Sequence, residues 1–354
     1  EDPSTLTITG GVFENLDDSA SAPNNTEIVI SSGKFTNQDG APAESVKDYV
    51  SEGMDLDESG NIVVSDDSVA MIDGKPYLTL QDAVDAAVKS SGETTITLRK
   101  NASGDGVVVP SGSNIVFDLN TFTYDIDGTT VGSPNTQTNG FQLLRDSTIT
   151  FKNGTITSSK AKILIQNYSD LTLDHVKLDG TNLGATNYTL SNNFGDVKIA
   201  DSTIIAPAGG YAFDVYYWPG NGYGDGVSVT VEGDSYIDGN IQYGSDGSDT
   251  ANVAQKASLI IKDGEFTGAI STYGLAADKE TGIAISGGNF AQPVNEDYIV
   301  PGMMRDENGD IVVDPDASTK IAAMIDGKPY ETLQAAVEAA KNGDVVKVFP
   351  GNHN

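Results

Sequence analysis

The sequence predicts an all-β fold, a right-handed parallel β-helix with short amphipathic capping helices. Two observations carry this prediction: a strand-and-corner pattern that recurs every twenty-odd residues, and an amphipathic segment that occurs twice. A net charge of −31, from 51 acidic and 20 basic residues, would suit a disordered chain. However, 38% of the residues are hydrophobic and stand in short alternating runs, which indicates a folded protein.

The strand-and-corner pattern reads apolar–x–apolar–x, two or three small or polar residues, x, and apolar. Eight segments share it: LTITGGVF (6–13), IVISSGKF (28–35), ITFKNGTI (149–156), LTLDHVKL (171–178), VKIADSTI (197–204), VTVEGDSYI (229–237), LIIKDGEF (259–266) and IAISGGNF (283–290). Alternation is typical of a half-buried strand, and the Gly, Asn or Asp that follows allows a sharp left-handed corner. Each segment therefore describes part of one β-helix coil, which covers its apolar edges by stacking on its neighbours. In a β-sandwich, hairpin turns would separate the strands instead.

A longer repeat divides the chain. MIDGKPY occupies residues 71–77 and returns at 324–330, which is 324 − 71 = 253 positions later. YVSEGMDLDESGNIVV (49–64) similarly matches YIVPGMMRDENGDIVV (298–313). We expect this chain to be a piece of a longer array. The predicted units are the C-terminal end of a preceding β-helix module (1–66), a complete module with an N-terminal capping helix (67–320) and the truncated start of a following module (321–354).

An amphipathic helix is predicted after each copy of MIDGKPY. Thr79 and Asp82 have the spacing of an N-cap and its N3 acid. The apolar face of the first helix, at about 80–89, consists of Leu80, Ala83, Val84 and Ala87. The second helix, at about 333–341, repeats this face with Leu333, Ala336, Val337 and Ala340. We expect each helix to lie across the open end of a β-stack, where unpaired strand edges would favour aggregation.

These segments resemble known proteins. The pattern Y-x-TLQ-x-AV-x-AA, with G-D-VV-x-V-x-PG after it, is similar to the entry segment of pectin-lyase-like right-handed β-helix proteins. ISGGNF, DYIVPGM and ENGDIVV resemble module ends in large secreted or surface proteins of gut Firmicutes. The resemblance implies a β-helix over nearly the whole chain. Because many pectin-lyase-like proteins cleave acidic polysaccharides, it also makes that activity an alternative function.

The catalytic elements of such enzymes are missing from the sequence. The clustered aspartates, the Gly-His-Gly element and the Arg-x-Lys element of the hydrolases do not occur. The lyases need an Arg or Lys base beside a calcium cluster, and the three arginines stand in unrelated contexts. Of the two histidines, His353 is near the end, and His175 stands at a coil corner, where we expect a turn residue. We therefore predict no catalytic residue.

No metal or other cofactor site is predicted. The segment DLDESGNIVVSD (55–66) spaces its acids much like an EF-hand calcium loop. Its Ser59-Gly60 pair indicates a hairpin instead, and Met304 stands where Asp55 stands in the first copy. The chain lacks cysteine, which excludes thiolate metal sites and disulfides. A chain with this many acidic residues could bind calcium elsewhere, but the sequence does not identify the position.

Charge and composition narrow the partners and the location. A charge of −31 repels phosphate backbones and anionic lipid, which argues against nucleic-acid and membrane-surface partners. No apolar run approaches the length of a membrane span. High Asn, Thr, Ser and Gly with little Lys is typical of extracellular β-proteins. We therefore expect a bacterial protein that is secreted or attached to the cell surface.

The stretch YAFDVYYWPGNGYGDG (211–226) carries the candidate ligand-binding site. It holds the only tryptophan, and Pro219 and three glycines predict a loop from Tyr216 to Tyr223. Aromatic rings would stack on sugar rings while carboxylates accept hydrogen bonds from sugar hydroxyls. The predicted ligand-binding residues are Trp218, Tyr216, Tyr217, Tyr223, Asp214 and Asp225. Alternatively, the loop packs its rings onto its own coil.

Together these observations predict a non-catalytic, adhesin-like β-helix module that contacts glycans or other host or cell-surface ligands. Two alternatives remain open. One is a polysaccharide lyase or glycoside hydrolase, and the other is a purely structural surface stalk.

Overall fold

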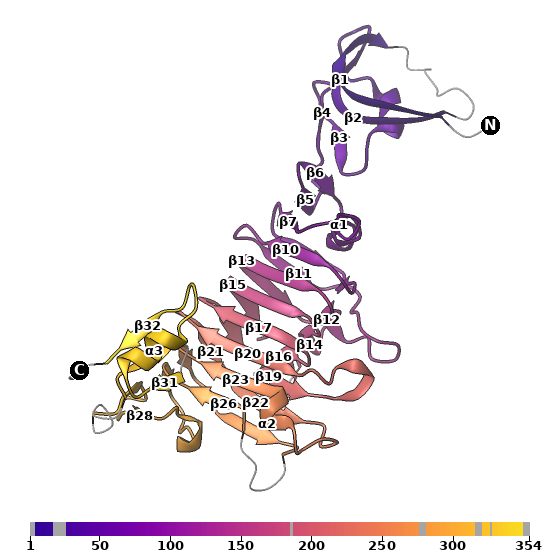
Figure 1. Ribbon diagram of the computed structural model, residues 1–354. Helices are drawn as coiled ribbons and strands as arrows, with labels where there is room; N and C mark the ends of the chain where they lie inside the picture. Colours follow the sequence, from indigo (N-terminus) through magenta and orange to yellow (C-terminus); the bar gives the residue numbers. More distant parts are fainter. Residues whose placement is uncertain are drawn as a thin grey trace.

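The computed structural model describes residues 4–16, 26–184, 187–275, 281–315, 321–325 and 328–349. A parallel β-solenoid of about 10 turns dominates it, as Figure 1 shows, and its helices are few and short. The predicted fold class is therefore confirmed. Six of the eight strand-and-corner segments begin on strands of the main solenoid, and the first two lie on β1 and β2, which form a sheet of their own.

Two sheets run along the main solenoid, one of 16 strands and one of 7 strands. In the larger sheet, each coil contributes a first strand, and these are β7 (Thr94–Leu98), β10 (Asn114–Asp118), β13 (Thr148–Ser158), β15 (Asp170–Asp179), β17 (Gly195–Ala200), β20 (Val227–Glu232), β23 (Ala257–Ile261) and β26 (Ile283–Ile285). In two coils the first strand, β13 or β15, continues through the corner. In the other six coils a separate second strand follows the corner, and these strands are β8 (Ala102–Gly104), β11 (Thr123–Ile126), β18 (Thr203–Ile205), β21 (Tyr236–Asp238), β24 (Glu265–Phe266) and β27 (Asn289–Phe290). The smaller sheet consists of β9 (Val107–Val109), β12 (Asn139–Leu143), β14 (Ile163–Asn167), β16 (Tyr188–Asn192), β19 (Tyr211–Tyr217), β22 (Asn240–Ser245) and β25 (Ile270–Tyr273).

The register stacks apolar side chains on apolar side chains. Phe117 of β10 pairs with Phe151 of β13, which pairs with Leu173 of β15, and all three are buried. The rings of Phe117 and Phe151 stack with centroids 4.6 Å apart. Because the coils are in register, one alternating pattern per coil produces a continuous core between the two sheets.

The first corner of each coil requires left-handed backbone geometry. Asn153, His175 and Asp201 occupy equivalent corners of consecutive coils, with φ of 58°, 53° and 48°. Short polar side chains tolerate this region better than most non-glycine residues. The prediction that His175 is a turn residue is therefore confirmed.

A separate short stack precedes the main solenoid. β1 (Ser4–Leu16) and β2 (Thr26–Asn37) form their own parallel sheet, followed by a 3-10 helix (Glu44–Tyr49) and the hairpin of β3 (Met54–Leu56) and β4 (Ile62–Val64). In the hairpin turn, Asp57 Oδ1 accepts hydrogen bonds from the backbone N–H groups of Ser59 and Asn61. The hairpin prediction for this segment is confirmed.

The first predicted helix covers one end of the main solenoid. α1 (Leu80–Ala87) follows the hairpin of β5 (Ala70–Ile72) and β6 (Lys75–Tyr77), and the Thr79 side chain caps it by accepting from Asp82 N–H. All four residues of its predicted apolar face are buried. The Gln81 side chain bonds both backbone groups of Val108, so it occupies the edge of β9.

The second predicted helix buries less of its apolar face than the first. α3 (Leu333–Ala339) lies beside a three-stranded sheet of β30 (Ala323–Ile325), β31 (Lys328–Tyr330) and β32 (Val346–Val348), which follows the hairpin of β28 (Met303–Arg305) and β29 (Ile311–Val313). Ala336 is buried, but Val337 is 56% exposed. A short helix, α2 (Val253–Lys256), and two further 3-10 turns (Gly220–Gly222 and Glu296–Tyr298) complete the elements. Within the described ranges, the helices are too short and too polar to cross a membrane.

Candidate functional site

The predicted loop begins later than expected. Tyr216 and Tyr217 belong to β19, because they pair with Gly244 and Ser245 of β22 and so extend the strand. The loop runs from Trp218 to Gly226 and contains the 3-10 turn of Gly220–Gly222. The placement of both tyrosines in a loop is therefore wrong. Tight backbone pairing with the following coil outweighed the local turn signals.

Alternation along β19 separates the predicted site residues. Phe213, Val215 and Tyr217 face the interior, and Tyr217 is only 3% exposed, with its hydroxyl 3.2 Å from Asp249 Oδ2. Asp214 and Tyr216 face the outer side of the smaller sheet. Tyr217 is therefore a core residue of its coil, while Tyr216 remains half-buried at the surface.

Two stacked pairs of tyrosines lie near the carboxylate of Asp214, since Tyr188 of one pair and Tyr273 of the other interact with it electrostatically. Tyr188 stacks on Tyr211 with ring centroids 5.0 Å apart, and Tyr216 stacks on Tyr273 at 5.9 Å. Asp214 is 6% exposed, and its oxygens accept hydrogen bonds from Asn192 N (2.6 Å) and Ser191 Oγ (3.1 Å). Burial raises the pKa of Asp214 to about 7. These bonds are internal, so Asp214 shapes the tyrosine surface from beneath.

A second group of rings, the aromatic cluster, consists of Tyr168, Phe194, Trp218 and Tyr223. Tyr223 is its centre, with ring centroids 4.9 Å from Tyr168, 5.4 Å from Phe194 and 5.5 Å from Trp218. Burial raises the pKa of Tyr168 to about 12, and its hydroxyl accepts a hydrogen bond from Gln166 Nε2 at 2.8 Å. Trp218 and Tyr223 are half-buried. The rings therefore support one another and still present part of their surface to solvent.

A cavity lined by carboxylates adjoins the aromatic cluster. It has a volume of about 410 Å³, and its wall includes Phe194 and the side chains of Asp146, Asp170, Asp196 and Asp225. Asp170 and Asp196 stand on adjacent strands, β15 and β17, and Asp170 Oδ1 accepts a 2.9 Å hydrogen bond from Asp196 N. The only basic residue in the wall of this cavity is Lys256. The charge of the cavity wall is therefore predominantly negative.

One short motif builds both the rings and the acids. Tyr168-x-Asp170, Phe194-x-Asp196 and Tyr223-x-Asp225 stand where three consecutive coils enter β15, β17 and β20. The first two copies are in register, whereas Tyr223-x-Asp225 stands three residues earlier along its coil, because Asp196 pairs with Ser228. The aromatic residues of the three copies meet in the cluster, and the aspartates line the cavity. Of these six residues, sequence reasoning named only Tyr223 and Asp225. The aromatic–x–Asp repeat was the signal that could have identified the other four.

The arrangement can hold a ligand that has an apolar face and hydrogen-bond donors. Half-exposed rings suit the C–H face of a sugar, and the neighbouring carboxylates accept from hydroxyl or ammonium groups. Comparison with known proteins adds no assignment: no protein-family model matches the chain, nor does any curated protein or solved structure.

Proposed function

We propose that the chain is a non-catalytic, adhesin-like β-helix module of a secreted or surface-attached bacterial protein, and that it binds glycans. The single observation that supports this function best is the aromatic–x–Asp repeat, which places rings and carboxylates side by side on three coils. Concave sites with a few convergent polar groups are the usual form of small-ligand sites. In this proposal the pectin-lyase-like resemblance accounts for the scaffold, and the aromatic–x–Asp motif accounts for binding.

The charge of the cavity specifies the class of glycan. The wall has four aspartates, of which Asp146 is ion-paired with Arg145, and one lysine, Lys256. This excess of negative charge favours sugars that carry ammonium groups, tolerates neutral sugars and repels uronic acids. The net charge of −31 acts in the same direction over the whole surface. We therefore expect affinity to fall in the order glucosamine oligosaccharides, neutral oligosaccharides, galacturonate oligosaccharides.

The test is a glycan array followed by titration of the full chain with the best oligosaccharide. Trp218→Ala should weaken binding by on the order of tenfold, because one stacking face is lost. Tyr236→Ala is the matched control, since Tyr236 is a half-buried aromatic residue on β21 in the other sheet. Binding that survives Trp218→Ala, or that prefers galacturonate oligosaccharides, would contradict the proposed site.

The enzyme alternative has one observation in its favour. Asp170, Asp196 and Asp225 share one cavity, and paired carboxylates are the groups that glycoside hydrolases use. Incubation with uronate-containing and neutral polysaccharides, followed by assays for new reducing ends and for unsaturated uronates, distinguishes this function. Product formation that Asp196→Asn abolishes would replace the binding proposal with a hydrolase or lyase.

A further inference from the structure

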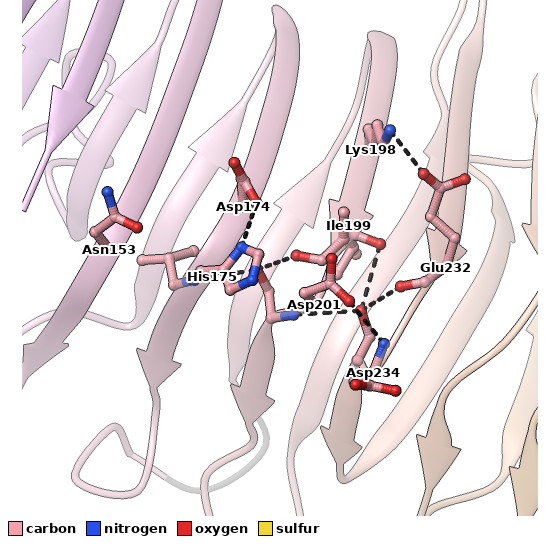
Figure 2. Close-up of polar contacts among 12 residues, drawn as sticks. Asn153, Asp174, His175, Lys198, Ile199, Asp201, Glu232 and Asp234 are labelled. Carbon is pink, nitrogen blue, oxygen red and sulfur yellow. Dashed lines mark hydrogen bonds and ion pairs between the residues drawn. The ribbon is translucent and has the colours of Figure 1, made fainter. Parts of the chain in front are cut away.

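A different corner of the solenoid brings together one imidazole and two carboxylates. Asp174 and His175 lie in β15, and Asp201 follows β17 on the next coil. Their ligand atoms all lie within 4.8 Å of one another, and Figure 2 shows the three side chains converging at the corner. The coil register produces this contact, because His175 and Asp201 occupy equivalent corners of adjacent rungs.

Two polar contacts orient these side chains. His175 Nδ1 lies 2.6 Å from Asp174 Oδ1, and Asp201 Oδ1 accepts a 2.9 Å hydrogen bond from Asp234 N. A Cβ atom on Gly233 would lie 2.2 Å from Asp201 Oδ1, so glycine leaves the space that this carboxylate occupies. Ligands fixed by surrounding contacts require little reorganisation on binding.

The surroundings of the three residues also suit a cation. An open depression of about 580 Å³ borders His175 and Asp201, and its wall includes the oxygen-bearing side chains of Asp118, Asn153 and Thr203. Lys177 lines it as well, but its ammonium group lies 2.7 Å from Asp179 Oδ2. On the other side, Lys198 lies 2.6 Å from Glu232 Oε1. Lys152, which pairs with Asp174 in the register of β13 and β15, lies 3.5 Å from Asp118 Oδ2. These three nearby lysines are thus ion-paired with other acids, and the cluster keeps an excess of carboxylates.

We propose that Asp174, His175 and Asp201 bind a divalent transition-metal ion of the Zn²⁺ class. Carboxylates alone would suit Ca²⁺ or Mg²⁺, but an imidazole ligand favours Zn²⁺, Co²⁺ or Ni²⁺. Three protein ligands leave coordination positions for water, which the open depression admits. The ion would replace the hydrogen bond between His175 and Asp174 and would link two adjacent coils. This site is separate from the proposed glycan surface and does not depend on it.

The corner itself supplies matched variants. His175→Asn removes the imidazole but keeps a residue that this corner accepts, since Asn153 occupies it with φ of 58° on the preceding coil. Asp201→Asn retains an oxygen for the Asp234 N–H group. Asp263→Asn is the control, because this exposed aspartate stands at the corresponding corner two coils beyond Asp201.

The experiment is calorimetric titration of the chelator-treated full chain with ZnCl₂, in a His353→Ala background that leaves His175 as the only histidine. Zn²⁺ should bind at one site and raise Tm, since a ligand that binds only the folded state stabilises it. His175→Asn and Asp201→Asn should each weaken binding by roughly tenfold or more, whereas Asp263→Asn should change it by less than about twofold. Ca²⁺ in tenfold excess should not displace Zn²⁺.

The imidazole signals of His175 in a ¹H–¹⁵N NMR spectrum provide a second readout. They should shift on addition of Zn²⁺ and should identify the nitrogen that binds the ion. Equal Zn²⁺ affinity in His175→Asn, or unchanged His175 signals at saturating Zn²⁺, would overturn the proposal. Melting curves of each variant without metal establish whether a loss of binding reflects a loss of folding.

Discussion

Asp214 is a residue whose charge depends on its neighbours in other coils. Its carboxylate points to the outer side of β19, yet it is only 6% exposed and is bonded to Ser191 and Asn192 of the preceding coil. Tyr188 and Tyr273 lie close enough to interact with it electrostatically. Burial favours the neutral acid and raises the pKa from the ordinary 3.8 to about 7. Burial also raises the pKa values of Tyr188 and Tyr273. The tyrosine surface is therefore built over an acid that titrates near neutral pH.

This raised pKa predicts a specific pH dependence of stability. Because the folded state binds the proton more tightly than the unfolded state, the contribution of Asp214 is complete below about pH 4 and is lost as the pH rises through 7. The loss is on the order of 4 kcal/mol. Asp214→Asn keeps an acceptor oxygen without the charge, so its Tm should exceed that of the wild type at pH 8 and approach it at pH 5. Melting curves between pH 4 and 8 measure this difference.

The exposed carboxylate of Asp263 provides the control for that experiment. Asp263→Asn removes one negative charge from the same acidic protein, and it should leave the difference from wild type nearly independent of pH. If Asp214→Asn behaved in the same way, the buried carboxylate would be ionised at little cost, and its placement beneath the tyrosines would be wrong.

The two copies of the helix show how tertiary context decides what one sequence pattern does. Thr79 and Thr332 cap their helices through the same bond to the third helical residue. Val84 is completely buried, whereas its counterpart Val337 is 56% exposed. The first helix packs against β5, β6, β7 and β9, whereas in the described part of the chain the second packs mainly against β30, β31 and β32. The capping signal is local, whereas burial depends on the coils that follow.

The duplicated valines give a matched pair of mutations. Val84→Ala removes two buried methyl groups from the end of the main core and should lower the free energy of unfolding by about 1.5–3 kcal/mol. Val337→Ala makes the same chemical change at an exposed position and should cost less than about 0.5 kcal/mol. Urea denaturation of the two variants tests the prediction. Similar losses for both would show that the second helix is covered to the same extent as the first.

The sequence predicts the features that depend on short local patterns, and it does not predict those that depend on contacts between coils. The helices, their caps, the β3–β4 hairpin and eight coils depend on patterns shorter than about ten residues, and these were found. The coil of β10 and β11 was missed because its corner holds four residues, Leu119 to Phe122, where others have fewer. The sequence predicts Trp218 and Tyr223 as site residues but not Tyr168 and Phe194, because these two rings meet Tyr223 only through the stacking of coils.

At the scale of the whole molecule, the described residues form separate cores. Ile30, Phe35 and Leu56 belong to one core, and the main solenoid contains another that runs from α1 to the last coils. In Figure 1 the sheet of β1 and β2 stands beyond the end of the solenoid that α1 covers. Polar contacts at the junction include Ser68 Oγ to the Gly53 carbonyl at 2.8 Å and Arg99 Nη1 to the Ser65 carbonyl at 2.9 Å. Polar contacts of this kind, rather than a shared hydrophobic core, connect the two stacks.

Separate cores predict two unfolding transitions for one chain. Phe35 is 2% exposed and stacks on Phe13 at 4.8 Å, so Phe35→Ala should destabilise the N-terminal stack by about 3–5 kcal/mol. Phe151 is fully buried between Phe117 and Phe141, so Phe151→Ala should cost a similar amount in the main solenoid. Each coil is stabilised chiefly by contacts with its adjacent coils. Each substitution should therefore lower the midpoint temperature of one calorimetric transition and change that of the other by less than about 1 °C. A single transition that both substitutions lower equally would mean that the junction couples the two stacks into one cooperative unit.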